Sequence, residues 1–223
     1  MAAAHQGLFD RLCAQKDVVV VTGGSVTQVR EQVTTRFDGR YFVLAQSGNE
    51  AIDKAGSMLW KEALSPEQSA AINAFIDKKL QRLLNMQVRD EHDLVEHRGA
   101  QITYSVLGFH EDVAKKYAYD PDDSKRAAAL AALATEVATL KEMGIEVTPA
   151  GTTSFNFIIA GKHKGFNVAR LIKREGWEKD ECVYVGDALF PGGNDETVIG
   201  VIPTHEVKDP DETFEFVQEL LAS

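Results

Sequence analysis

Short apolar runs separated by turn residues give the first part of the chain its pattern. Four consecutive valines at positions 18–21 precede Thr22-Gly-Gly-Ser25, and valines then recur at helical spacing. This order predicts a strand, a tight turn and a helix. An unbroken β-branched run is typical of a strand that is buried on both faces of a parallel sheet. A second apolar run, Tyr41–Leu44, predicts the next strand.

In the middle of the chain, apolar and polar residues follow a different pattern from that of the first part. Ser65, Pro66 and Gln68 form the N-terminal cap of a predicted helix whose apolar residues then lie on one side. Apolar and polar residues alternate over 102–106, which predicts an antiparallel strand with one covered face. One long helix is expected over 123–143, and strand-like "IEVTP" and "TTSFNFIIA" follow it. This section predicts a compact α+β unit.

Beyond Lys162 the pattern of alternating strands and helices returns. We expect a helix over Phe166–Glu175, a strand over Cys182–Val185, a strand over Thr197–Ile202 and a last helix capped by Asp209.

The change of pattern and its return predict two domains. Residues 1–61 and 162–223 would form one doubly wound α/β core with a parallel sheet, and residues 62–161 would form an inserted α+β cap. A chain of 223 residues with 44% hydrophobic content is long enough for this arrangement.

Composition narrows the range of partners. The chain has 24 Lys and Arg against 34 Asp and Glu, a formal charge of −10, which disfavours binding to nucleic acid or to an anionic membrane. No apolar stretch approaches the roughly 18–20 residues of a membrane span, and the N-terminus lacks the features of a signal peptide. Cys13 and Cys182 fit neither a disulfide framework nor a zinc pattern, so we expect a cytoplasmic protein.

The loop at Thr22-Gly23-Gly24-Ser25 is one candidate for ligand binding. Ligands of parallel sheets bind beyond the carboxyl ends of the strands. Here the glycines would allow close approach, the two hydroxyls could donate, and the amides of the next helix could bind an anion. The alternative is that the loop is only a turn.

A second candidate is "GDALFPGGNDE" at 186–196. Oxygens of Asp187, Asp195 and Asn194 would suit Mg²⁺, although a solvated acidic turn is an equal alternative. Lys164 stands at the expected start of a helix, where the helix dipole disfavours a cation and an anionic partner would explain it. Surface lysines are nevertheless common.

These motifs, in this order and spacing, resemble the second, third and fourth motifs of the haloacid dehalogenase (HAD) superfamily. Together with "EHRGAQITYSVLG" and "TTSFNFIIAGKHKGFN", they resemble its phosphomannomutase-like branch over nearly the whole chain. The resemblance implies a HAD-type Rossmann-like core with an inserted C2-type cap of type IIB. It also implies a small-molecule phosphate ester as substrate, with a homodimer through the cap as one mode of assembly.

The resemblance also implies roles for individual residues. Thr22 would contact the transferring phosphoryl group, Lys164 would neutralise its charge, and Asp187 would ligate Mg²⁺ with support from Asp195 and Asn194. The implied substrate-binding residues are Gly23, Gly24, Ser25, Arg98, Ser154 and Asn156. Positioning and charge compensation of this kind are what phosphoryl transfer requires.

Two positions in the cap depart from the mutase pattern. Asn156 stands where the mutases have aspartate, and Phe109 stands where they have a second arginine. A mutase must hold phosphate at both ends of its substrate, so a sugar-phosphate phosphatase is at least as well supported as a mutase.

The superfamily's first motif is the larger departure. We do not find the apolar strand ending in Asp-x-Asp-Gly-Thr that would supply the nucleophile. Asp10 in "GLFD" lies in what resembles an amphipathic helix, only eight residues before the valine strand. We therefore expect an N-terminally shortened form with impaired or absent turnover. The alternative is a non-catalytic protein that binds phosphate and metal.

Overall fold

The computed structural model describes residues 1–84, 88, 90–191 and 193–222. The chain divides into two compact units: Met1–Lys61 with Lys162–Ser223, here called the core unit, and Glu62–Gly161, here called the cap unit.

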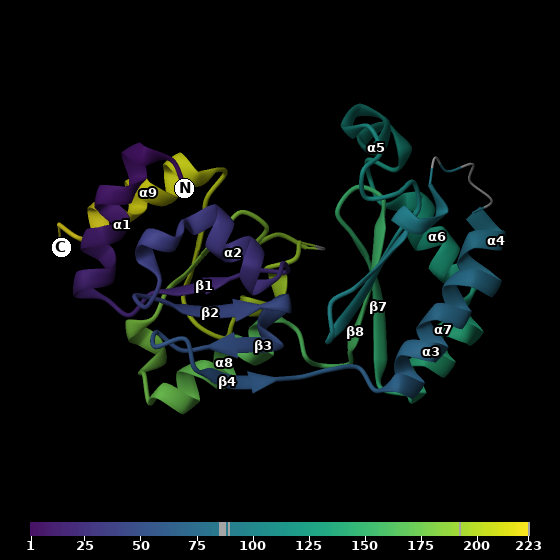
Figure 1. Cartoon of the computed structure of the whole chain (residues 1–223), viewed down its shortest axis with the longest axis horizontal. Coiled ribbons are helices and arrows are strands. Elements are labelled where there is room, and N and C mark those ends of the chain that lie inside the picture. Colours follow the sequence, from purple (N-terminus) through teal and green to yellow (C-terminus); the bar gives the residue numbers. More distant parts are fainter. Residues whose placement is uncertain (85–87, 89, 192, 223) are drawn as a thin grey trace. The chain divides into compact units, whose positions relative to one another are not determined.

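The core unit contains elements from both ends of the chain (Figure 1). Its helices are α1 (Ala3–Gln15), α2 (Val26–Val33), α8 (Lys164–Glu175) and α9 (Pro210–Leu220). Its strands are β1 (Val19–Val21), β2 (Phe42–Ala45), β3 (Glu50–Ile52), β4 (Met58–Lys61), β9 (Tyr184–Gly186) and β10 (Thr204–Glu206).

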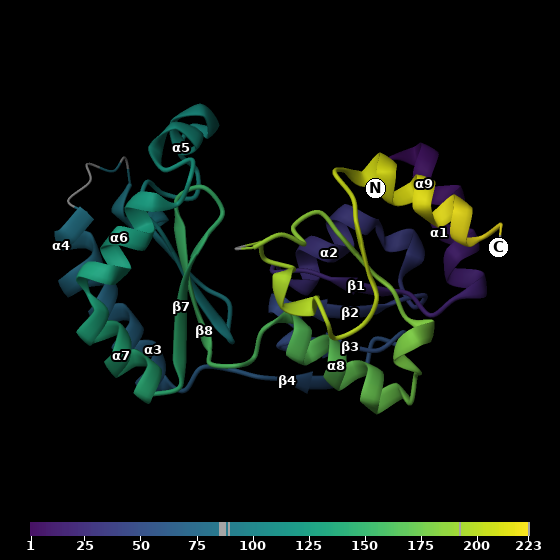
Figure 2. The ribbon, with the colours of Figure 1, turned by 180° about the vertical axis from the view of Figure 1, so that it is seen from behind.

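The strands of the core unit combine parallel and antiparallel pairs. β1 pairs parallel with β2, and β3 and β4 extend this sheet as an antiparallel hairpin. Among the described residues, β9 and β10 form a separate parallel ladder. Figures 1 and 2 show α2 and α8 on opposite faces of the β1–β4 sheet, and α1 beside α9. Helices on both faces confirm the predicted α/β core.

Strand β1 differs from the expectation of complete burial. All three residues of Val19–Val21 are half-buried. The reason is that β1 is hydrogen-bonded within the described sheet only to β2, so it is an edge strand there.

The prediction of a strand over Thr197–Ile202 is wrong. A 3-10 turn occupies Glu196–Val198, and an isolated bridge joins Ile199 to Ile202. Gly200 has φ +81°, a left-handed conformation that interrupts extended backbone. The pairing strand is instead β10, which begins two residues after Ile202.

The cap unit is an α+β layer structure, as predicted. Its helices are α3 (Pro66–Phe75), α4 (Gln81–Leu84), α5 (Val113–Tyr119), α6 (Ser124–Ala132) and α7 (Ala134–Glu142), with a π-helical turn at Ile76–Leu80. Its strands are β5 (Val95–His97), β6 (Gln101–Ser105), β7 (Ile145–Ala150) and β8 (Ser154–Ile159). They form one antiparallel sheet in the order β5-β6-β8-β7.

Figures 1 and 2 show α3, α6 and α7 on one side of the cap sheet. Side chains from alternate positions of β6 and β8 face these helices in one apolar cluster, among them Ile102, Tyr104, Phe155 and Phe157. The expected capping box of Ser65 and Gln68 is confirmed by both of its hydrogen bonds. The alternation therefore leaves the other face of the sheet polar.

Two helical features of the cap unit differ from the sequence prediction. The single helix expected over 123–143 is divided into α6 and α7, because Leu133 leaves helical geometry with φ −109° and ψ 26°. Helix α5 was not predicted because its large apolar residues, Val113 and Tyr117, are 66% and 64% exposed and give no buried stripe.

None of the helices in the described part of the chain combines the length and the apolar character needed to cross a lipid bilayer.

Candidate functional site

The start of α8 is held tightly against the segment after β9. His163 caps the helix by accepting a hydrogen bond from the amide of Phe166 at 3.2 Å. The amide of Gly165 donates to Thr197 Oγ1 at 3.2 Å. A Cβ on Gly165 would lie 1.8 Å from the carbonyl oxygen of Thr197, so only glycine allows this contact. Helix α8 thus begins at Lys164, two residues before the expected start at Phe166, and Lys164 lies in its first turn.

Lys164 forms a buried ion pair at this point. Its Nζ donates to Asp195 Oδ1 at 2.5 Å and to Asn194 Oδ1 at 3.2 Å. Lys164 is 6% exposed and Asp195 is 3% exposed. Each charge compensates the other where neither is solvated. The structure therefore brings together three of the residues singled out in the sequence.

Tyr184 also contacts Asp195 and was missed by the sequence analysis. Its hydroxyl donates to the same Oδ1 at 2.7 Å. Burial raises the pKa of Tyr184, and the hydrogen bond and charge of Asp195 and the nearby charge of Asp187 raise it further. Tyr184 is therefore neutral and a hydrogen-bond donor at physiological pH. The only available sequence signal was an aromatic residue in the aliphatic run before Gly186.

Asp187 follows β9 directly and is exposed. The second oxygen of Asp195, Oδ2, lies only 2.6 Å from where a Cβ on Gly186 would be, so it faces the end of β9. The intervening loop is closed by a hydrogen bond from the amide of Asp195 to Ala188 O at 3.2 Å. The loop thus returns Asp195 to the strand end that carries Asp187.

The donor set at this strand end fits a hydrated divalent cation. Asp195 Oδ1 and Asn194 Oδ1 are bonded to Lys164, which leaves Asp195 Oδ2 and the carboxylate of Asp187. Mg²⁺ is commonly held by one or two carboxylates and completes its coordination with waters and substrate phosphates. Among the residues that the structure describes, no group of three or more histidine, cysteine or acidic side chains could hold a metal ion.

The Thr22–Ser25 loop has the predicted strand-to-helix geometry. Thr22 Oγ1 accepts a hydrogen bond from the amide of Gly24 at 3.0 Å, which leaves its proton available to another acceptor. Ser25 and Gln28 form a capping box at the start of α2. The hydroxyl of Ser25 is therefore engaged in capping the helix, whereas Gly23 has no heavy atom near its missing side chain.

Buried asparagines connect this loop to the start of α8. The amide of Ser47 donates to Thr22 O at 2.8 Å, and Asn167 Nδ2 donates to Ser47 O at 3.0 Å. Asn49 Nδ2 bonds to Lys162 O at 2.9 Å. Both asparagines are fully buried and were missed, because nothing in the sequence showed that the loop of Asn49 meets the start of α8, where Asn167 lies. They hold Thr22 and Lys164 in one framework.

The remaining predicted residues lie in the cap unit. Arg98 forms an ion pair with Glu96, with Nη2 and Oε2 2.5 Å apart. Asn156 accepts hydrogen bonds on Oδ1 from Gln101 and Thr103, both at 3.0 Å. Ser154 begins β8, and its carbonyl oxygen accepts a hydrogen bond from Arg126 at 3.0 Å.

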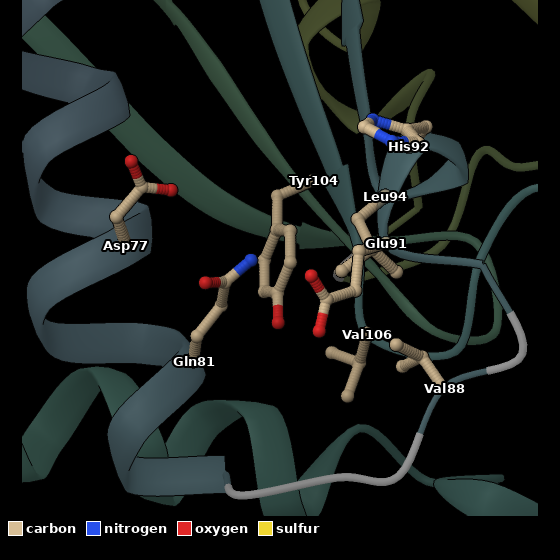
Figure 3. Close-up of a pocket in the computed structure, with 8 residues that line it drawn as sticks. All are labelled: Asp77, Gln81, Val88, Glu91, His92, Leu94, Tyr104 and Val106. Atoms are coloured by element: carbon tan, nitrogen blue, oxygen red, sulfur yellow. The ribbon is translucent and has the colours of Figure 1, made fainter.

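A cavity of about 410 Å³ lies on the helix side of the cap sheet. Figure 3 shows Gln81 and Glu91 on either side of the Tyr104 ring, with Asp77 and His92 farther out. Burial raises the pKa of the Tyr104 hydroxyl. None of the predicted site residues lines this cavity, so it is separate from the polar sheet face.

Comparison with known families supports the expected resemblance. A family model described as eukaryotic phosphomannomutase matches residues 6–223. No curated protein matches the sequence.

Solved structures with the same fold include proteins of several organisms. An IMP-bound mutant of Plasmodium falciparum IMP-nucleotidase matches with a TM-score of 0.69 at 13% identity, over 100% of this chain and 64% of that one. SMU.1108c of Streptococcus mutans UA159 matches with a TM-score of 0.66 at 18% identity, over 98% and 91% of the two chains.

A haloacid dehalogenase-like hydrolase of Bacteroides thetaiotaomicron matches with a TM-score of 0.63 at 13% identity, over 98% of this chain and 92% of that one. The chain spans about two thirds of the length of the IMP-nucleotidase chain and most of the other two. At these identities the likeness shows the fold, which is that of the haloacid dehalogenase-like proteins with a core and a cap.

Proposed function

Since the chain belongs to the eukaryotic phosphomannomutase family, we propose that its core unit binds the phosphoryl group of a small phosphorylated metabolite, a sugar phosphate, together with Mg²⁺. The chemistry served is phosphoryl transfer, by a phosphatase or a mutase. The family assignment supports this class of reaction, and the core-unit geometry supports the binding of an anion.

The observation that carries the proposal is the position of Lys164. Its ammonium is buried in the first turn of a 12-residue helix, although the positive end of a helix dipole disfavours a cation there. Asp195 offsets part of this cost. A phosphate bound near the same helix end would be stabilised by the charged donor of Lys164 and by the positive end of the helix dipole.

Each core-unit residue then has a role consistent with its contacts. Thr22 donates its remaining proton to a phosphoryl oxygen, and Lys164 neutralises phosphoryl charge. Asp187 and Asp195 Oδ2 would hold Mg²⁺, and when bound this ion supplies charge neutralisation and polarisation of a phosphoryl oxygen. Tyr184 holds Asp195 by its other oxygen.

One observation favours a second candidate function, a protein that binds phosphate and metal without a covalent step. Asp10 is the residue whose sequence surroundings come nearest to the expected nucleophile motif, but it lies inside α1 and forms an ion pair with Arg40. It is therefore not at a strand end. We propose that these residues bind phosphate without forming an aspartyl phosphate, so turnover by this chain is low or absent.

Calorimetric titration of inorganic phosphate in the presence of Mg²⁺ tests the binding site. We expect Lys164→Gln to weaken binding at least about tenfold, because a hydrogen bond to a charged group contributes about 1.5–3 kcal/mol. Lys173→Gln changes an exposed lysine in the last turn of the same helix and should leave affinity within about twofold. Thr22→Val creates no unpaired buried charge and tests the same site if Lys164→Gln fails to fold.

Hydrolysis of p-nitrophenyl phosphate with Mg²⁺ separates the two candidates. Phosphate binding without turnover supports the non-catalytic form. Turnover that Asp187→Ala abolishes would assign catalysis to this site and would rule out the non-catalytic form. If the unaltered chain binds no phosphate, the proposed function is wrong.

A further inference from the structure

The cavity on the helix side of the cap sheet has a volume of about 410 Å³ and is lined by residues of the cap unit alone. This volume is in the range of sites that hold small molecules. Its lining combines apolar side chains, among them Leu94 and Val106, with the polar groups of Asp77, Gln81 and Glu91. None of these residues has a role in the proposed function, so the cavity is a second candidate site.

The hydroxyl of Tyr104 points into this cavity, between Gln81 and Glu91 (Figure 3). Tyr104 is only 2% exposed, and its ring is stacked on that of Phe155 with the ring centroids 6.1 Å apart. Among the described residues, the Tyr104 hydroxyl has no hydrogen-bond partner. Buried polar groups are normally hydrogen-bonded, so the expected partner of this hydroxyl is a molecule inside the cavity.

A π-helical turn over Ile76–Leu80 contributes one wall of the cavity. Ile76 and Leu80 are fully buried in the apolar cluster of the cap unit. Asp77 and Gln81 are four residues apart, so they lie on a common face of the helical run, and both line the cavity. Turns of this kind are rare and occur frequently at functional sites. The turn therefore presents a carboxylate and an amide to the same space.

A 3-10 turn over Glu91–Asp93 contributes another wall, and the rest of the cap unit holds this turn in place. Asp90 caps the turn by accepting a hydrogen bond from a backbone amide at 2.8 Å. Asp93 accepts a hydrogen bond from the amide of His110 at 2.7 Å and bonds to the His110 ring at 2.6 Å. The backbone that carries Glu91 is therefore fixed beside the cavity.

The charges around the cavity favour a cation. Asp77 and Glu91 are exposed, and neither carboxylate forms an ion pair with a residue that the structure describes. Other acidic residues of the cap unit are paired with lysine or arginine, as are Glu96, Glu111 and Glu136. The described lining residues include neither lysine nor arginine. An ammonium group, which has three donors and no acceptor, matches this excess of acceptor oxygens.

We propose that this cavity binds a small organic cation, a primary ammonium group on a short apolar body. The ammonium donates to Glu91 and to the hydroxyl oxygen of Tyr104, Asp77 adds negative charge, and the apolar body lies against Leu94 and Val106. A bare metal ion fits less well, because no metal-holding group of three acidic, histidine or cysteine side chains occurs in the described part of the chain. The site does not depend on phosphate binding by the core unit.

Calorimetric titration with three probes that share a phenyl group tests the charge of the ligand: 2-phenylethylamine, 2-phenylethanol and 3-phenylpropionate. We expect the amine to bind at least about tenfold more tightly than the alcohol, because only the amine forms charged hydrogen bonds. The propionate should bind more weakly than the alcohol, since the two carboxylates repel it. Raising the ionic strength from about 0.05 M to about 0.5 M should weaken binding of the amine but not of the alcohol, because salt screens exposed charges.

Variants of the lining residues assign binding to the cavity. Glu91→Gln removes an exposed carboxylate with little change in size and should weaken amine binding about threefold to tenfold while leaving the alcohol unchanged. Tyr104→Phe removes only the hydroxyl and should weaken amine binding by a similar factor. Glu67→Gln makes the same chemical change in the first turn of α3, away from the cavity lining, and should alter neither ligand. Circular dichroism shows whether each variant is folded.

Each outcome supports or overturns the proposal. Preference for the amine that is reduced by Glu91→Gln and by Tyr104→Phe supports it. If the amine does not bind, or binds no more tightly than the alcohol, the proposal is wrong, and so it is if Glu91→Gln and Glu67→Gln have equal effects. Titration with Ca²⁺ tests the metal alternative: Ca²⁺ binding that Glu91→Gln abolishes, without amine binding, would overturn the proposal in favour of a metal site.

Discussion

The close contact between Gly165 and the backbone of Thr197 predicts that a single methyl group added at position 165 lowers the stability of the core unit. In Gly165→Ala the new Cβ would begin 1.8 Å from the Thr197 carbonyl oxygen, and 1.2 Å of movement is needed to reach 3.0 Å, below which real Cβ atoms essentially never come. The obstacle is backbone on a turn that also carries Asp195, so a side-chain rotation cannot relieve it. The first turn of α8 and Lys164 would have to move.

The expected magnitude follows from two opposing effects. Overpacking of a closely packed site costs about 1–3 kcal/mol, and a clash with backbone belongs at the upper end. Alanine in place of glycine inside a helix returns about 0.5–1 kcal/mol. We therefore expect Gly165→Ala to lower the free energy of unfolding of the core unit by about 2 kcal/mol, equivalent to about 4–8 °C in Tm.

Gly7→Ala is the matched control. Gly7 also lies inside a helix, α1, and a Cβ there would meet no atom within 4 Å. The same substitution should therefore stabilise the core unit by about 0.5–1 kcal/mol. Urea unfolding followed by tryptophan fluorescence measures both variants in the right unit, because Trp60 and Trp177 both belong to the core unit.

A neutral or stabilising Gly165→Ala would refute the reasoning. So would equal effects of the two substitutions, since these differ only in what the added methyl group meets. Phosphate titration of Gly165→Ala adds a second criterion: displacement of Lys164 should weaken binding even at temperatures where the variant is folded.

The remaining predictions concern the buried ion pair between Asp120 and Arg126 in the cap unit. Asp120→Asn should destabilise the cap unit by about 3 kcal/mol in urea unfolding followed by circular dichroism, because Arg126 would keep its charge but lose a buried partner; Asp123→Asn, whose side chain is 54% exposed, should cost less than about 1 kcal/mol. The pKa of Asp120 is lowered overall, since burial raises it but hydrogen bonds from Arg126 and two backbone amides outweigh that effect. Its stabilisation should be complete above about pH 5 and should be lost as the pH falls through the folded-state pKa, below the unfolded value of about 3.9. An acid-unfolding curve that is the same in the unaltered chain and in Asp120→Asn would contradict this assignment.

Several features of the chain could be predicted because they depend on residues close together in sequence. The capping box of Ser65 and the cap at Asp209 each use a partner within three residues, and the structure contains both. The alternation in β6 gave the correct apolar face toward the helices, but the expectation of only one covered face is wrong, because Gln101, Thr103 and Ser105 are buried as well.

Where local pattern and tertiary packing disagreed, packing prevailed. The apolar residues near 197–202 have strand character, but the turn there packs against Gly165 and accepts a hydrogen bond from its amide, so the pairing strand begins later.

The sequence alone determined the two-part organisation, the main helices and strands, and the residue types from which a phosphate site could be made. Tertiary structure decided which of those residues meet. Tyr184 and Lys164, which are 11 and 31 residues away from Asp195 in the sequence, both bond to its Oδ1. Asn49 bonds to the carbonyl oxygen of Lys162, 113 residues away. Local caps depend on neighbours that the chain always keeps together, whereas this convergence depends on the packing of α8, β9 and the loops around them, which no local pattern contains.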